Sequence, residues 1–368
     1  MLNKIIVYFK NFDWALFLPV FLLLCFSLAE IYSVSLGRGG SDLFNFKKQS
    51  IFIILGLGLL FIFSFFDYRS LRSLSILLYF FGLISLILVL IYGVTIRGTK
   101  GWFHFFGLGL QPVEFIKIFL IIFLARYFSS ISLKGEPIKH IVISGIGTFI
   151  FFILVLAQPD FGSALILFFV WLAMIIMAGF NKKYLAVILL IILVLGAFSW
   201  LFYFKPYQKE RLLTFLNPSF EPLSQGYNVA QAIIAVGSGG LWGRGIGFGS
   251  QSQLKFLPES QNDFIFGVIS EELGFLGVIL VFLFFGIFFY RLLVNIKKIN
   301  NDFGIFFILG VMSLIFIEMF INIGMNIGVL PVIGISLPFL SYGGSAMLAN
   351  LIMVGIVENI IIKSKLNY

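Results

Sequence analysis

Asp263 is the first candidate for chemistry, because it stands where a long polar stretch of the chain meets an apolar one. The segment before it, about residues 204–262, is dense in Gly, Ser, Gln and basic residues, and the segment after it begins Phe-Ile-Phe-Gly-Val-Ile. Unpaired charge is costly in a bilayer, so a carboxylate at this boundary is a functional hypothesis by default. As a general base it would accept a proton from a substrate hydroxyl. Stabilisation by the macrodipole of the following helix is the structural alternative.

Glu114 and Lys117 form a second candidate pair, because residues three apart share one face of a helix. Lys117 follows Gln111 by six residues, which is roughly 9 Å along a helix axis. A charge at that depth needs a partner or a water-filled cavity. One interpretation is a buried ion pair that fixes helix packing. The other is a Lys117 ammonium that binds an anionic head group in a polar cavity, with Glu114 holding it in place.

Asp160 and several basic residues extend the set of candidates. Asp160 follows a proline in a tight turn, where it could cap exposed backbone N–H groups or help to shape a polar cavity. The polar segment 204–262 also carries Arg211, Arg244 and Lys255. Such groups attract phosphate and pyrophosphate. A solvated basic loop near anionic lipid is an equally simple interpretation.

The sequence excludes several familiar sites. The glycine-rich stretch 237–249 lacks the Gly-Lys-Ser/Thr ending of a P-loop. His104 and His140 are predicted on opposite sides of the membrane, so they form no metal pair. Cys25 is the only cysteine, which rules out an internal disulfide and a cysteine metal cluster. A metal held by carboxylates remains open.

The elements that position these residues are apolar, because the chain is 60% hydrophobic and only 11% charged. Soluble domains carry roughly 25% charged residues. The composition therefore predicts a polytopic membrane protein. Most Lys and Arg residues behind the net charge of +9 lie in short connections beside apolar runs, where they orient helices. We predict no surface for nucleic acid.

The predicted fold class is an all-α polytopic membrane protein with a single domain, residues 1–368. A membrane-crossing helix needs roughly 20 apolar residues, and about ten runs meet this requirement. We interpret the first as a retained span and not as a removed signal peptide. The runs lie near residues 14–36, 49–66, 74–96, 112–128, 141–157, 161–180, 184–203, 264–290, 303–325 and 344–362. The large loop, about 204–262, follows the seventh.

The basic residues predict that both termini are cytoplasmic, because this orientation keeps most short basic connections inside. Seven spans then precede the large loop, so that loop and Asp263 lie on the outer face. The same parity places three further polar clusters there, in residues 97–104, 111–117 and 158–163. We expect nothing comparable to line the inner face.

Three other features belong to this outer face. Trp102 could anchor at the membrane interface or stack on a sugar. The late loop 330–345 could be a re-entrant segment that lines the cavity, although simple helix-breaking packing is equally compatible. Gly267 and Glu271 follow Asp263 at four-residue spacing, which predicts a polar seam along one face of the helix.

Most of the polar motifs of the chain match one known pattern. They are Gln158-Pro-Asp160, Arg211-Leu-Leu-Thr-Phe-Leu-Asn-Pro218, Gly226-Tyr-Asn-Val-Ala-Gln231, Ala235-Val-Gly-Ser-Gly-Gly-Leu241, Gly249-Ser-Gln-Ser-Gln-Leu254, Phe256-Leu-Pro-Glu259, Asp263-Phe-Ile-Phe266 and Pro338-Phe-Leu-Ser-Tyr-Gly-Gly-Ser345. With these motifs the chain resembles the SEDS family (shape, elongation, division and sporulation proteins), and its rod-shape member RodA more than its division member FtsW. The resemblance covers nearly the whole chain.

The resemblance implies a peptidoglycan glycosyltransferase that polymerises the undecaprenyl-linked disaccharide lipid II on the outer face of the cytoplasmic (inner) membrane. It implies as partners a class B penicillin-binding protein, which is a transpeptidase, and proteins of the elongation complex. The family's essential aspartate falls on Asp263 and its outer-loop tryptophan on Trp102. Glu259, Ser341 and Ser345 lie in its motifs and join the candidates for substrate binding.

This chain departs from the family beside Asp263. The family usually has His-Thr where this chain has Gln261 and Asn262. We expect activity to survive, with different hydrogen bonds around Asp263.

These inferences meet in one mechanism. The 4-hydroxyl of an acceptor sugar attacks the anomeric carbon of a pyrophosphate-linked donor with inversion, and Asp263 accepts the hydroxyl proton. Basic side chains, or a divalent cation such as Mg²⁺ or Mn²⁺, would stabilise the departing pyrophosphate. No other cofactor is predicted.

Two alternatives from other classes remain. A lipid II flippase could use Glu114, Lys117 and Glu318 to line a translocation path. A non-catalytic scaffold of a wall-synthesis complex would leave the outer polar clusters without a role. Purified protein supplied with lipid II alone in detergent separates the three hypotheses, because only an enzyme makes polymer there.

Overall fold

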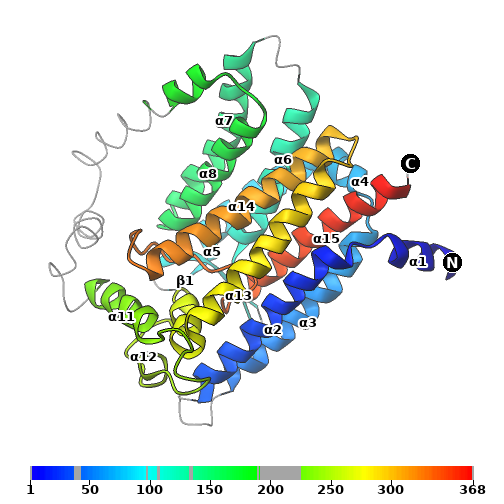
Figure 1. The fold of residues 1–368 in the computed structure, drawn as a ribbon. Helices are drawn as coiled ribbons and strands as arrows, with labels where there is room; N and C mark the ends of the chain where they lie inside the picture. Colours follow the sequence, from blue (N-terminus) through cyan, green and yellow to red (C-terminus); the bar gives the residue numbers. More distant parts are fainter. Residues whose placement is uncertain are drawn as a thin grey trace.

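Long helices packed side by side form most of the molecule in the computed structural model (Figure 1). The structure describes residues 2–36, 43–96, 98–105, 108–131, 136–188, 190 and 225–366. The helices are α1 (Leu2–Asn11), α2 (Trp14–Leu36), α3 (Phe44–Phe65), α4 (Tyr68–Ser73), α5 (Ser75–Tyr92), α6 (Pro112–Ser130), α7 (Pro137–Leu156), α8 (Phe161–Met177), α11 (Gln225–Ser238), α12 (Ser250–Gln253), α13 (Ile265–Ile296), α14 (Asp302–Asn326) and α15 (Gly344–Leu366). The strands are β1 (Val94–Ile96), β2 (Thr99–Phe105) and β3 (Leu108–Leu110).

The helices confirm a polytopic helical membrane protein. Among the described residues, 7 helices are long and apolar enough to cross a membrane, and α8 is a shorter apolar helix. Each predicted span except 184–203 coincides with one of the helices above. The span 184–203 lies mostly outside the described residues. The count of ten spans and the orientation of the chain therefore stay predictions.

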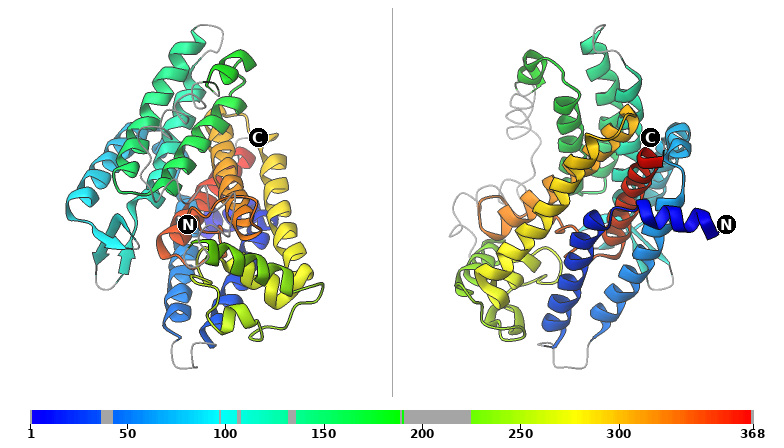
Figure 2. Two further views of the ribbon diagram at one scale, coloured as in Figure 1. Left: turned by 90° about the vertical axis from the view of Figure 1, so that its left-hand side faces the viewer. Right: turned by 45° about the vertical axis from the view of Figure 1, so that its right-hand side comes forward.

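The structure departs from the predicted all-α fold at one end of α5, where a small sheet follows. The third predicted span was drawn to residue 96, but α5 ends at Tyr92 and the chain continues as an antiparallel sheet in the order β1-β2-β3. Trp102 pairs with Val94 across the sheet. β-branched and aromatic residues favour strands, and Gly98, with a φ of +82°, allows the turn between β1 and β2. Figure 2 shows the strands (cyan) beyond the ends of α5 and α6.

The predicted loop over about 204–262 contains helices in its described part. Residues 225–238 form α11, and residues 250–253 form the short helix α12. Val229, Ala232 and Ala235 recur at helical spacing and are buried, and Ala232 and Ala235 belong to one apolar cluster with Phe264 and Val268. This apolar face explains why the segment folds as a helix against α13. The first part of the predicted loop, residues 204–224, lies outside the described residues.

Helix α13 is two helices joined at Gly274, whose φ is +64°. A residue with a side chain is strained in that conformation, whereas glycine is not. The second half begins with free backbone N–H groups, and two carbonyls of the preceding loop accept hydrogen bonds from them. Phe275 N donates to Gly240 O (2.9 Å) and Leu276 N donates to Leu241 O (3.3 Å). The loop after α11 is thereby fixed to the middle of α13.

The core is built around α15, which is the most buried of the long apolar helices in the described part of the chain. It runs through the middle of the bundle and packs most closely on α3 (Figure 1). The two backbones approach each other at Gly355, where an added Cβ would collide with the backbone of Leu60. Close backbone approach through small residues is a common way to pack helices in membranes.

Replacing Gly355 with Ala should destabilise the protein. The new methyl meets backbone atoms of Leu60, which cannot rotate away, and overpacking of this kind costs about 1–3 kcal/mol. Gly58 on α3 is the matched control, because an added Cβ there has nothing within 4 Å. Thermal unfolding in detergent should show a lower Tm for G355A and an unchanged or higher Tm for G58A. Equal melting of both variants would contradict this account of the α3–α15 contact.

Candidate active site

Asp263 lies in a turn just before α13, and its backbone is fixed by two asparagines of α14. The helix begins at Ile265, so Asp263 precedes it instead of forming its first turn. The Asp263 carbonyl oxygen accepts hydrogen bonds from Asn322 Nδ2 (2.9 Å) and Asn326 Nδ2 (3.0 Å). Both asparagine side chains are fully buried, whereas Asp263 is half-buried. The turn is therefore held rigidly and its carboxylate lies near the surface.

The late segment, residues 331–343, packs against this turn. An added Cβ at Gly334 would lie 3.6 Å from Asp263 Oδ2, and Asn322 Nδ2 also donates to Ile335 O (2.7 Å). Asn322 thus holds the Asp263 turn and the late segment to each other. The sequence left open whether this segment lines the Asp263 cavity, and the structure places it beside the carboxylate.

Two further hydrogen bonds join the late segment to the residues before Asp263. Ser341 Oγ donates to Asn262 O (2.6 Å), and Tyr342 N donates to Gln261 O (2.8 Å). Ser341 Oγ also accepts from Leu337 N (2.8 Å). The Ser341 hydroxyl is therefore engaged with the backbone on both sides.

The other polar clusters predicted on the Asp263 side also lie against the late segment or against each other. Ser345 Oγ accepts from Gln111 N (2.9 Å), and Gln111 Nε2 donates to Asp160 Oδ2 (3.2 Å). Lys100 N donates to Gln158 O (3.2 Å), which attaches the sheet to the turn before α8. We call this end of the bundle the Asp263 end. The convergence expected from the sequence is present in the described residues.

Asp160 caps α8. Its Oδ1 accepts from Ser163 N (3.0 Å) and its Oδ2 accepts from Ser163 Oγ (2.8 Å), in addition to the bond from Gln111. Of the two interpretations of Asp160, the geometry favours capping.

Trp102, in β2, is half-buried, and an added Cβ at Gly109 of β3 would touch its ring.

Lys117 forms a buried triad with two glutamates. Its Nζ lies 2.9 Å from Glu114 Oε1 on the same helix and 2.7 Å from Glu318 Oε1 on α14. The Lys117 side chain is only 4% exposed. This geometry matches the interpretation as a buried ion pair, with Glu318 as a partner that the sequence analysis had not assigned to it. The triad joins α6 to α14.

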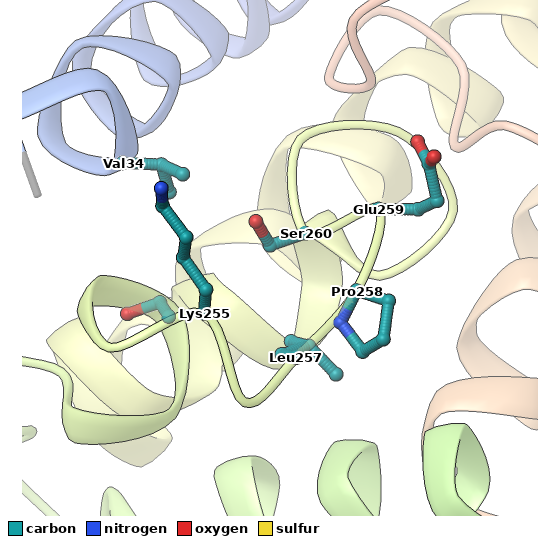
Figure 3. Close-up of a pocket in the computed structure, with 7 residues that line it drawn as sticks. Val34, Lys255, Leu257, Pro258, Glu259 and Ser260 are labelled. Carbon is teal, nitrogen blue, oxygen red and sulfur yellow. The ribbon is translucent and has the colours of Figure 1, made fainter. Parts of the chain in front are cut away.

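Lys255 and Glu259 line a cavity of about 340 Å³ at the Asp263 end (Figure 3). The Lys255 side chain extends toward Val34 of α2, whereas the Glu259 carboxylate points away from Lys255. Both residues have left-handed backbone conformations, with φ values of 63° and 49°. Such conformations cost on the order of 1–3 kcal/mol each for residues with side chains, and they concentrate at functional sites. The cavity is lined by Val34, Ser252, Lys255, Leu257, Pro258, Glu259 and Ser260.

The structure says less about the other basic residues that were predicted to attract pyrophosphate. Arg244 is exposed, and its guanidinium donates to Ser250 Oγ (2.8 Å). Arg211 lies outside the described residues. Within the part of the chain that the structure describes, no group of three or more His, Cys, Asp or Glu residues could hold a metal ion. The metal requirement stays open.

Two glutamates of α13 have a structural role that the sequence analysis did not predict. Glu271 and Glu272 of α13 are fully buried. The Glu271 carboxylate accepts from the backbone N–H groups of Gln251 (2.8 Å) and Ser252 (3.0 Å). The Glu272 carboxylate accepts from Gly247 N (3.1 Å) and from a nearby glutamine side chain. The predicted polar seam from Asp263 through Glu271 is therefore wrong, because Glu271 is used to fasten the loop 247–253 to α13.

The opposite end of the bundle also carries a polar network, contrary to expectation. Asp13 accepts from Arg291 (2.7 Å) and Asn295 (2.6 Å), and Asp13 N donates to Glu358 Oε2 (3.0 Å). Burial raises the pKa of Asp13, but the hydrogen bonds from Asn295 and Arg291 outweigh it and hold that pKa below its usual value. These residues join the start of α2 to α13 and α15. They are far apart in sequence, so composition alone could not pair them.

Comparison with known proteins identifies the family. The model of the FtsW, RodA and SpoVE family, described as cell cycle proteins, matches residues 13–366. The chain belongs to this family. It is 35% identical over 357 residues to stage V sporulation protein E of Bacillus subtilis, covering 95% of this chain and 96% of that protein. It is 32% identical over 350 residues to peptidoglycan glycosyltransferase MrdB of Escherichia coli, covering 95% and 93%.

A solved structure has the same fold. That structure is described as the structural coordination of polymerization and crosslinking by a peptidoglycan synthase complex. Its matching chain is 31% identical to this chain, and the two superpose with a TM-score of 0.81. The match covers 96% of this chain and 98% of that chain. The resemblance to the SEDS family inferred from the motifs is confirmed.

The departure from the family pattern beside Asp263 has a structural account. Gln261 Oε1 accepts from Asn45 Nδ2 (2.7 Å) and Gln261 Nε2 donates to Ser35 Oγ (3.2 Å), so this glutamine bridges α2 and the start of α3. Asn262 Nδ2 donates to Glu259 Oε2 (2.7 Å). Both side chains hold the loop in front of Asp263.

Replacing Lys117 with Met should strongly destabilise the protein, because it leaves Glu114 and Glu318 buried without a cation. Removing one partner of a buried ion pair costs about 3–5 kcal/mol. The triple variant E114Q/K117M/E318Q buries no charge and should recover most of that loss. Thermal unfolding of the three proteins in detergent measures the difference. A K117M protein that melts with the wild type would show that the ammonium is not part of a buried triad.

Proposed function

We propose that this chain is a peptidoglycan glycosyltransferase that polymerises lipid II at the Asp263 end. One observation carries the proposal: a half-buried carboxylate whose backbone is fixed by Asn322 and Asn326 and whose side chain faces the irregular segment 331–343. A relative in the same family is named a peptidoglycan glycosyltransferase, which supports this activity for the chain.

The reaction is an inverting transfer. The 4-hydroxyl oxygen of the acceptor sugar forms a bond to the anomeric carbon of the donor, and the bond between that carbon and the pyrophosphate oxygen breaks. Asp263 accepts the hydroxyl proton, and undecaprenyl pyrophosphate leaves with the bonding electrons. A carboxylate opposite the leaving group performs this role in inverting sugar chemistry. Fixing the Asp263 turn keeps the base in place for each transfer.

The remaining candidates have roles around this base. Lys255, Arg244 and Arg211 are proposed to attract the pyrophosphate, because cations stabilise developing negative charge. A divalent cation such as Mg²⁺ or Mn²⁺ would supply the same stabilisation. Trp102, on the sheet beside the turn before α8, is proposed to contact a sugar. Ser341 and Ser345 are engaged with backbone groups, so we assign to Ser341 the positioning of the late segment and to Ser345 the positioning of Gln111 before α6.

The Asp263 end is proposed to face the outside of the cytoplasmic membrane, because the opposite end collects most basic connections.

The partner is proposed to be a class B penicillin-binding protein, within a complex for cell elongation. The similar chain in a complex that couples polymerization to crosslinking supports such a partner. The similarity to proteins of sporulation and of glycan synthesis is of nearly equal size, so elongation stays a prediction.

The geometry supports a lipid II flippase less well than it supports a glycosyltransferase. Glu114, Lys117 and Glu318 were the residues proposed to line its path, and they are buried and bonded to one another. An open path would need them accessible to a lipid head group. A scaffold would not require the rigid mounting of Asp263.

Replacing Asp263 with Asn should reduce lipid II polymerisation by at least about a hundredfold, because an amide accepts no proton from the attacking hydroxyl. Asp302 supplies the matched control, since it is an exposed carboxylate at the start of α14 and D302N makes the same chemical change. Polymer made from purified lipid II in detergent is measured by gel. Normal polymer from D263N would refute the base, and absence of polymer from the wild-type chain would refute the enzyme.

Replacing Asn322 with Ala should lower kcat of polymerisation about ten- to a hundredfold with little change in KM, because a small misplacement of a catalytic group is costly. Asn359 is the control, since it is a buried asparagine bonded to the backbone of Ser64 and Tyr68 at the other end of the bundle. Both variants lose comparable hydrogen bonds. Steady-state kinetics therefore separate a misplaced Asp263 from a general loss of folded structure. Equal loss of kcat in N322A and N359A would contradict a positioning role.

A further inference from the structure

A second pocket lies at the end of the bundle opposite Asp263. It has a volume of about 480 Å³ and is lined by Arg69, Arg72, Ser73, Arg126, Ser130 and Asn301. These residues come from α4, from the end of α6 and from the residue that caps α14. Figure 1 shows α4 close to the C-terminus of the chain, away from α11 and α12.

The pocket concentrates positive charge without a balancing carboxylate. Three of its lining side chains are guanidinium groups, and none of the lining residues is acidic. In the described part of the chain, no ion pair joins Arg69, Arg72 or Arg126 to a carboxylate. Like charges gathered in one pocket repel each other, so an anion bound among them would be stabilised.

In the described residues, the nearby acidic groups form no ion pair with the guanidinium groups of the pocket. Asp67 precedes Arg69, but its Oδ1 accepts from Arg69 N (3.0 Å) and its Oδ2 accepts from Lys363 Nζ (3.1 Å). Asp302 is exposed and does not line the pocket. The guanidinium groups of Arg69 and Arg72 therefore keep their donors available.

The walls of the pocket are fixed in advance. Asn301 Nδ2 donates to the Tyr68 hydroxyl (3.0 Å), which attaches the start of α14 to α4. Arg126 donates to Ser75 Oγ (2.8 Å), which attaches α6 to the start of α5. A ligand that binds here does not have to order these elements, which favours affinity.

We propose that this pocket binds the phosphate group of an anionic phospholipid. Guanidinium groups bind phosphate oxygens through paired hydrogen bonds, and the serine hydroxyls are further donors. Ile76 and Leu77, at the start of α5 and soon after the pocket residue Ser73 in the chain, are 51% and 65% exposed. They offer a surface for acyl chains, which a soluble phosphate ion does not need. Basic pockets between membrane helices bind lipid head groups in this way. The proposal is independent of the glycosyltransferase mechanism.

The variant R69Q/R72Q tests the site. It removes two charges from the pocket and keeps Arg126, which holds α6 to α5. The control K182Q/K183Q removes the same charge from two exposed residues after α8 that do not line the pocket. Full-length proteins in detergent are titrated with dioleoylphosphatidylglycerol, with dioleoylphosphatidylcholine and with inorganic pyrophosphate. Native mass spectrometry counts the molecules bound.

The wild-type chain and K182Q/K183Q should retain phosphatidylglycerol, and R69Q/R72Q should retain it about tenfold more weakly. Phosphatidylcholine should bind weakly to all three proteins. Pyrophosphate binding that is lost in R69Q/R72Q, without retention of phosphatidylglycerol, would overturn the assignment to a lipid and identify the ligand as a soluble phosphate. Equal retention of phosphatidylglycerol by both variants, or no preference for it over phosphatidylcholine, would overturn the proposal. Lipid II polymerisation by R69Q/R72Q provides a check that the variant is folded.

Discussion

The hydrogen bonds from Asn322 of α14 are the interaction on which the candidate active site depends. Backbone N–H and C=O groups within a membrane need partners, and an irregular segment does not supply them internally as a helix does. The Asp263 turn and the late segment 331–343 are both irregular. Asn322 Nδ2 reaches the carbonyl oxygen of Asp263 and that of Ile335, and Asn326 adds a second donor to Asp263. One buried side chain therefore fixes the distance between the proposed base and the wall that it faces.

The need for partners inside a membrane also applies to charged side chains. Two of the charged groups buried among helices are held by partners: Lys117 lies between Glu114 and Glu318, and Glu271 accepts hydrogen bonds from backbone N–H groups of a loop. These groups hold elements together and are not accessible to a substrate. Asp263, at a half-buried position beside a non-helical segment, differs from them. Its exposure and its rigid backbone together are what a reusable base needs.

The sequence predicted much of the fold, because apolar runs of bilayer length are visible without tertiary information. It also predicted that the clusters at Gln111 and Gln158 approach each other, since helix parity places their loops on one face. It failed where an apolar run changes structure without changing polarity: Val94 continues the composition of α5 but belongs to a strand. Helix α11 was detectable from the spacing of Val229 and Ala232, but the glycines around it concealed the signal.

Pairings between distant residues were the part that sequence reasoning could not supply. Lys117 and Glu318 are 201 positions apart, and their contact depends on the register of α6 against α14. Asp13 and Arg291 depend likewise on how α2 meets α13. Asn322 carried no distinctive motif, and its importance is visible only once the carbonyl groups around it are located. The candidate base could be named from its place in the chain, whereas its support could not.

The most direct measurement is to locate the sugar on the protein. A lipid II analogue with a photoreactive group on its disaccharide would be activated by light on the purified chain, and the labelled peptides would be mapped by mass spectrometry. The account predicts labels in residues 255–264 and 331–343, on the two sides of the Asp263 carboxylate. Labels confined to the opposite end of the bundle, around Arg69 and Arg126, would contradict it.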